Sequence, residues 1–168
     1  MRLVFDSTTL IYFAKLRILQ LLGKMKGEKI IPFFVHKEVV EKGIKKGKED
    51  AYFIDGLIKQ DVFVVEKCRN EFFKKISEIR NLSMADAETL ALAKEKRSVA
   101  VIDESILRSV AQTYNVEYRE LIFLLFQLYH EKAIKKIEIK KYLDEMIKLG
   151  WRCSTELYVS ILQEIEKL

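Results

Sequence analysis

The chain has 168 residues, of which 49% are hydrophobic and 33% charged. This balance excludes a disordered chain and fits one domain with a full core, or a compact domain with an added helical tail. The longest apolar run, residues 121–126, is far shorter than the ~20 residues that a membrane-spanning helix needs, so no membrane partner is expected. The 30 Lys and Arg against 25 Asp and Glu give a net charge of +5, which permits a polyanionic partner without requiring one.

Cysteine use is sparse. Cys68 and Cys153 are the only two cysteines, and they form neither a CxxC motif nor a disulfide framework. The first residues run directly into an apolar segment with no signal-peptide pattern. Together these features predict a reducing, cytoplasmic setting.

Short apolar runs alternate with amphipathic segments up to residue 118. In chain order, the patterns predict a strand at 2–5, a helix at 8–22, a strand at 29–31 stopped by Pro32, helices at 35–45 and 50–59, a strand at 61–65, a helix at 69–80, a helix opened by Ser83, a strand at 98–102, a helix at 104–114 and a short strand at 116–118. Such alternation favours an α/β fold with a parallel sheet.

The remainder of the chain is helical in pattern, with a break near Gly150 and a cap at Ser154. We therefore expect a single domain over 1–168, with a core at about 1–118 and a C-terminal helical extension at about 119–168. The apolar run 121–126 could be a buried helix, a partner groove or a homo-oligomer face.

Four acidic residues stand where strands are predicted to end or helices to begin: Asp6, Glu38, Asp86 and Asp103. Asp6 and Asp103 directly follow apolar runs, which places them at the carboxyl edge of the sheet, where α/β proteins bind ligands. Carboxylates gathered at one edge repel each other and are tolerated when a divalent cation lies among them. A metal site is therefore the leading hypothesis.

Each acid also has an ordinary explanation. Asp6 and Asp103 could cap the following helices, Asp86 could complete a capping box with Ser83, and Glu38 could lie on a solvated helix face. Ser, Thr or Asn would cap equally well, however, and both strand-ending positions carry a charge. The acids would share one pocket if the first and fourth strands were neighbours, a strand order that the sequence does not reveal.

The residues near these acids restrict the chemistry. Carboxylates without a nearby His or Cys favour Mg²⁺ or Mn²⁺, and the two histidines and two cysteines lack zinc-ligand spacing. No nucleophile elbow, Walker A motif or dinucleotide loop is present. Glu88 points away from Asp86 on a regular helix and is expected to be a support or surface residue. The hydroxyls of Ser7, Thr8 and Ser105 could orient a carboxylate or a water, or could cap helices.

Taken together, these motifs resemble the PIN domain, a family of metal-dependent nucleases that includes VapC-type toxins and archaeal RNA-processing enzymes. The resemblance covers residues 1–118 in order and spacing, and it rests on Val4-Phe5-Asp6-Ser7-Thr8, on Glu38 before Val39-Val40, on Ala85-Asp86-Ala87-Glu88-Thr89-Leu90 and on Val101-Ile102-Asp103. It implies a three-layer α/β/α fold with a short central parallel sheet, and Asp6, Glu38, Asp86 and Asp103 as the catalytic, metal-binding quartet for Mg²⁺ or Mn²⁺.

The resemblance further implies a metal-dependent endoribonuclease with an RNA substrate, in some members the toxin that a small antitoxin protein blocks. A catalytically silent PIN-fold module that binds RNA or protein is the alternative. Other Asp-using α/β folds fit poorly: a haloacid-dehalogenase-like phosphatase needs a second Asp where Thr8 stands, and a phosphorelay receiver needs adjacent acids where Ser7 follows Asp6.

A basic segment follows Glu38. Its lysines, Lys42, Lys45, Lys46 and Lys48, could meet a phosphate backbone, or they could form a flexible, solvated turn. Arg108, just beyond Asp103, could approach the same pocket or remain on the surface.

Overall fold

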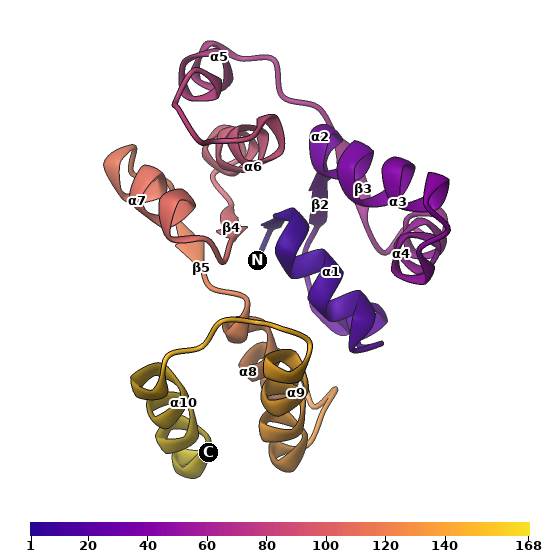
Figure 1. Cartoon of the computed structure of the whole chain (residues 1–168), viewed down its shortest axis with the longest axis vertical. Helices are drawn as coiled ribbons and strands as arrows, with labels where there is room; N and C mark the ends of the chain where they lie inside the picture. The colour runs from indigo at the N-terminus through magenta and orange to yellow at the C-terminus, as the bar shows by residue number, and fades with distance from the viewer. The chain divides into compact units, whose positions relative to one another are not determined.

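The computed structural model describes residues 1–168 and divides them into two compact units, Met1–Leu121 and Ile122–Leu168 (Figure 1). A five-stranded sheet lies in the first unit, in the order β3-β2-β1-β4-β5, and every neighbouring pair is parallel. The strands are β1 Leu3–Phe5, β2 Lys29–Pro32, β3 Val64–Glu66, β4 Val99–Val101 and β5 Tyr118–Arg119. The predicted parallel α/β sheet is confirmed.

The central strand, β1, decides where a site can form. Its residues Leu3 to Phe5 are almost fully buried, as a parallel strand covered on both faces requires. β1 pairs with β2 on one side and with β4 on the other, so the direction of winding changes between β1 and β4. Ligands bind at the carboxyl ends of strands beside such a reversal.

Helical segments cover both faces of the sheet and make the predicted three-layer α/β/α arrangement (Figure 1). α6 packs directly on β1, β2 and β4 and is flanked by α5 and α7, whereas α1 packs on α4 and on the segment around Glu38. The segments of this unit are α1 Ser7–Lys15, η1 Leu19–Lys24, α2 Phe33–His36, η2 Lys37–Glu41, α3 Lys42–Lys45, α4 Glu49–Lys59, α5 Glu71–Ser77, α6 Met84–Glu95 and α7 Ser105–Thr113.

Several predicted elements were wrong in extent: the helix expected at 69–80 covers Glu71–Ser77, the strand expected at 116–118 covers Tyr118–Arg119, and two others differ for a reason that the backbone shows. The helix expected at 8–22 ends at Lys15, because Arg17 adopts a left-handed φ of 55° that a helix cannot accommodate, and a 3-10 segment follows. The strand expected at 61–65 occupies residues 64–66, because Asp61 adopts a φ of 57° in the turn after α4. The sequence gives no sign of these two left-handed residues, because neither is a glycine, the residue that usually adopts a positive φ.

The predicted helix at 35–45 is one helical run with a change of winding in its middle. α2, η2 and α3 follow without interruption from 33 to 45, and η2 is a π-helical turn. Such turns accommodate an extra residue within an α-helix and are frequent at functional sites. Glu38 lies in this turn.

The second unit consists of α8 Ile122–His130, α9 Lys136–Lys148 and α10 Thr155–Lys167. Gly150 has a φ of 98° just after α9, and the Ser154 hydroxyl accepts a hydrogen bond from the Leu157 N–H, so the predicted break and cap are confirmed. The Tyr158 hydroxyl donates to Asp144 Oδ1 at 2.8 Å and joins α10 to α9. In the apolar run, Leu124 and Leu125 are buried. None of the helices combines the length and apolar character that a bilayer-spanning segment needs.

The close contact between α3 and α4 allows a prediction about stability, for which a second glycine in α4 serves as the control. A Cβ on Gly43 would lie 2.5 Å from the Ala51 Cβ, whereas a Cβ on Gly56, within α4, would meet nothing within 4 Å. We expect Gly43→Ala to lower the free energy of unfolding by about 1–3 kcal/mol through overpacking. Gly56→Ala should raise it by roughly 0.5–1 kcal/mol through helix propensity. Urea denaturation measures both, and equal effects would contradict the close approach.

Candidate metal and nuclease site

Asp6 lies at the carboxyl end of β1 and is only 2% exposed. Its carboxylate caps α1, since Oδ1 accepts from the Thr9 N–H at 2.7 Å, and Oδ2 accepts from the Asp103 N–H at 3.1 Å. Burial raises the pKa of Asp6 to about 7, against the opposing effect of these two donors. One carboxylate therefore joins the end of β1 to the loop after β4.

Asp103 lies in that loop, just after β4. Because β1 and β4 are neighbours in the sheet, Asp103 lies beside Asp6, as expected if the first and fourth strands were adjacent. The Arg108 guanidinium donates to the Asp103 carbonyl oxygen at 2.9 Å and lies 3.2 Å from Glu120, so Arg108 holds the loop in place. The Asp103 carboxylate lies close enough to Tyr12 on α1 to add to the effect of burial, which raises the pKa of that phenol. Glu104 rather than Asp103 occupies the N-cap position of α7, and its side chain makes no capping hydrogen bond.

Glu38 reaches the same region from the π-helical turn. The Ser7 hydroxyl donates to Glu38 Oε2 at 3.1 Å, so a predicted orienting hydroxyl next to Asp6 does contact one of the four acids. The Glu38 side chain is exposed to solvent. Asp6, Ser7 and Glu38 thus form a continuous polar path from the buried strand end to the surface.

Asp86 fulfils the capping role that its sequence pattern predicts. Ser83 N–H donates to Asp86 Oδ2 at 3.1 Å, and the Ser83 hydroxyl accepts from the Asp86 N–H at 3.1 Å. The pKa of Glu104 is raised above its ordinary value. Burial is the largest cause, and the nearby carboxylates of Asp86 and Glu38 add to it. Glu104 is therefore a fifth acid in the region. Sequence reasoning assigned it only to the start of a helix, although its place beside Asp103 was a signal.

The donor set fits a hard divalent cation, because each of the acids offers only carboxylate oxygen, and mutual repulsion opposes their gathering without a cation. Asp6 and Asp103 are in contact, and Glu38 adjoins them through Ser7. No three His, Cys, Asp or Glu side chains, however, converge closely enough in this conformation to hold an ion. Glu38 contacts Ser7, the neighbour of Asp6, and both Glu38 and Asp86 lie near enough to Glu104, the neighbour of Asp103, to raise its pKa.

Glu88 lies on α6, is fully buried, and holds neighbouring backbone segments through hydrogen bonds. Its Oε2 accepts from the Phe34 N–H at 2.6 Å, where α2 begins, and its Oε1 accepts from the Cys68 N–H at 3.0 Å, after β3. Burial raises the pKa of this carboxyl, while the two amide donors and Lys67 oppose the rise. Of the two predicted roles, support and surface, the structure shows support.

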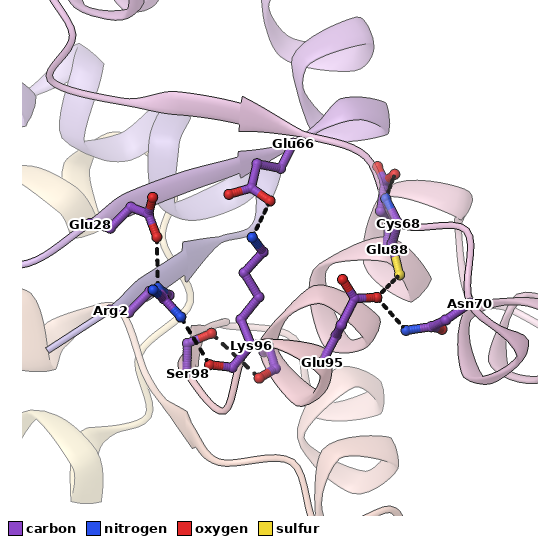
Figure 2. Close-up of polar contacts among 10 residues, drawn as sticks. Arg2, Glu28, Glu66, Cys68, Asn70, Glu88, Glu95, Lys96 and Ser98 are labelled. Carbon is purple, nitrogen blue, oxygen red and sulfur yellow. Dashed lines mark hydrogen bonds and ion pairs between the residues drawn. The ribbon is translucent and has the colours of Figure 1, made fainter.

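Figure 2 shows how polar contacts hold the surrounding elements. Glu95, near the end of α6, accepts from Asn70 Nδ2 at 2.6 Å and from Cys68 Sγ at 3.4 Å. Lys96 lies 2.5 Å from Glu66 at the end of β3, and Arg2 lies 2.7 Å from Glu28. These contacts attach the end of α6 to β3 and to the loop after it, and they join the residue before β1 to the residue before β2.

Comparisons with known proteins identify the family and the fold. The sequence profile of the DUF3368 family, described as a PIN domain, matches residues 2–167. No protein with a curated description matches the sequence significantly. Among solved structures, a PilT N-terminus domain protein from the hyperthermophilic archaeon Sulfolobus solfataricus P2 superposes with a TM-score of 0.55 at 15% identity, over 76% of this chain and 93% of that one. A domain of a functionally unknown protein from Methanocaldococcus jannaschii gives a TM-score of 0.48 at 23% identity, over 71% of this chain and 89% of that one.

The fold and the family match define the class of the protein: an α/β domain with the PIN architecture. The chain belongs to the PIN-domain family DUF3368. The resemblance expected from the sequence is confirmed.

Glu88 generates a test of the support that it provides. Glu88→Gln keeps one acceptor oxygen and turns the other position into a donor, which leaves the Phe34 or the Cys68 N–H without a partner. We expect a loss of about 1–3 kcal/mol in the free energy of unfolding. The exposed Glu78→Gln is the control and should stay within about 0.5 kcal/mol of the parent. Matching losses in the two variants would rule out a supporting role for Glu88.

Asp6 predicts a pH dependence of stability. Its pKa is about 7 in the folded chain and near the ordinary 3.8 when unfolded, so between these values the folded chain holds a proton that the unfolded chain has released. Stability should therefore fall as the pH rises from about 4 to about 7, by at most roughly 4 kcal/mol, and stay level above that.

The Asn side chain of the Asp6→Asn variant cannot ionise, so the variant lacks this pH-dependent contribution to the free energy of unfolding. In urea denaturation with EDTA, the difference in unfolding free energy between Asp6→Asn and the parent should move in favour of the variant as the pH rises. A constant difference across the range would show that Asp6 is ionised throughout.

Proposed function

We propose that the chain is a metal-dependent endoribonuclease that hydrolyses RNA phosphodiester bonds at a carboxylate site for Mg²⁺ or Mn²⁺. The proposed site residues are Asp6, Glu38, Asp86 and Asp103. The observation that carries the proposal is the contact between the Asp103 N–H and Asp6 Oδ2, which brings the ends of β1 and β4 together at the reversal of the sheet in a PIN-family chain.

The proposed site residues would have different roles. A bound divalent cation would supply an acidified water and offset negative charge on the phosphate. Asp6 is held in one orientation by its two amide donors, and Arg108 fixes the backbone of Asp103, so these two acids form the preorganised part. Glu38 and Asp86 lie on helices at the rim and would complete the ligand set. No protein nucleophile is required.

The toxin of a toxin–antitoxin pair is the biological role that we propose for this activity, with a small antitoxin protein as the partner that blocks the site. The chain would act in the cytoplasm on single-stranded or structured RNA. A homo-oligomer is compatible with this role.

A second candidate is a catalytically silent PIN-fold module that binds RNA or protein. One observation favours it: in this conformation no three acidic side chains converge to hold an ion. Metal binding and cleavage separate the two candidates.

For the nuclease test, labelled single-stranded RNA, structured RNA and single-stranded DNA are incubated with Mg²⁺, Mn²⁺ or EDTA. We expect cutting of RNA only with metal, and a loss of at least about a hundredfold in rate for Asp6→Asn and Asp103→Asn, since each removes charge from the reacting centre. Asp61→Asn is the matched control, because Asp61 precedes β3 at the opposite edge of the sheet. An Asp6→Asn protein that cuts as fast as the parent would exclude Asp6 from catalysis.

A thermal shift experiment adds a readout independent of cleavage. Mn²⁺ should raise the melting temperature of the parent and of Asp61→Asn at mildly alkaline pH, where Asp6 is ionised, but not that of Asp6→Asn. A shift in all three proteins would place the cation elsewhere. No shift together with no cutting would favour the silent module.

A further inference from the structure

A polar pocket of about 280 Å³ adjoins the proposed site and shares Glu38 with it. It lies between the η2–α3 segment and the beginning of α4. Its charged lining consists of Lys42, Lys46 and Lys48 against Glu38 and Asp50, and Gly43 forms part of its wall. Lys45, although in the same segment, does not line it.

The ammonium groups of the three pocket lysines make no ion pair or hydrogen bond within the chain, even though two carboxylates line the same pocket. Elsewhere in the chain lysines do pair, as Lys59 does with Asp55 and Lys96 with Glu66. Three cations around one small pocket repel each other, and an anion held between them would relieve that repulsion. The charge of the lining therefore favours an anionic occupant.

Backbone hydrogen bonds connect the residues of the segment that carries these lysines. Gly43 O accepts from the N–H of Lys46 and of Lys48, each at 3.0 Å, and Gly47 N–H donates to Ile44 O at 2.9 Å. Gly47 supplies a φ of 67°, and Gly43 permits a close approach to Ala51 that any Cβ would prevent. The segment is therefore a short helix, α3, followed by a hydrogen-bonded turn.

We propose that this pocket binds the phosphate backbone of the RNA strand immediately beside the bond to be cut, through Lys42, Lys46 and Lys48. The inference rests on the proposed function. Glu38 belongs both to the acidic site and to the pocket lining, so a strand whose scissile phosphate lies at the acids continues directly into the lysines. The lining contains no aromatic ring for a base to stack on, so the pocket recognises phosphate rather than sequence.

Binding is measured with EDTA present, so that metal-dependent cutting does not occur. The probe is a fluorescein-labelled single-stranded RNA of mixed sequence, followed by anisotropy over a range of salt concentrations. The pocket variant is Lys42→Ala/Lys46→Ala/Lys48→Ala. The control variant is Lys24→Ala/Lys26→Ala/Lys45→Ala, which removes the same charge from exposed lysines outside the pocket, two of them at the amino edge of the sheet before β2.

We expect the pocket variant to lose at least about tenfold in affinity. Its plot of log affinity against log salt should become shallower by about 0.7 for each phosphate that the pocket neutralises. The control variant should remain within about threefold of the parent, because none of its three lysines lines the pocket. Equal melting temperatures for the two variants show that both are folded. A similar loss on single-stranded DNA of the same sequence supports a contact to the phosphates.

The result separates the pocket from the nuclease function. If the parent cuts nothing with metal but only the pocket variant loses affinity, the pocket stands and the nuclease proposal fails. If the parent cuts RNA and the two variants bind alike, the nuclease proposal stands and the pocket is overturned. Failure of the parent to bind the RNA also overturns the pocket.

Discussion

The Asp6 carboxylate is the interaction on which the candidate site depends. It occupies the end of the central strand, caps the first helix through the Thr9 N–H, and accepts from the Asp103 N–H in the loop after β4. The hydrogen bond from the Asp103 N–H joins residues that are 97 positions apart in sequence. Because the carboxylate is buried, it has no solvent to replace either donor, so its position determines where both strand ends lie.

A carboxyl group is ordinarily ionised and exposed to water, and the buried position of Asp6 opposes this preference. Burial raises the pKa of Asp6 to about 7, and neighbouring carboxylates add to the rise of the Glu104 pKa. A chain selected for stability alone would be served by a neutral cap at the same position. An ionisable carboxyl kept at a desolvated strand end is a pattern that active sites show, where stability is given up for a reactive arrangement.

The fold explains why the acids come from four different segments. β1 and β4 bring Asp6 and Asp103 to one edge, α6 presents Asp86 in its first turn, and the π-helical turn presents Glu38. Glu88, one turn from the capping box, attaches α6 to the beginning of α2 and to the loop after β3. The helix that carries Asp86 and the helical run that carries Glu38 are thereby held together through a buried carboxylate.

Local sequence determined the elements whose signals are local: the apolar strands, the Ser83–Asp86 capping box, the break at Gly150 and the four acids as candidates. The tertiary structure decided what depends on distant residues. It placed β4 beside β1, assigned Glu88 to the interior, added Glu104 to the acidic region, and ended α1 at Lys15. It also put three of the four lysines of one segment around a pocket that includes Glu38. Strand order and side-chain direction arise from packing between segments far apart in the chain, which no spacing pattern within one segment records.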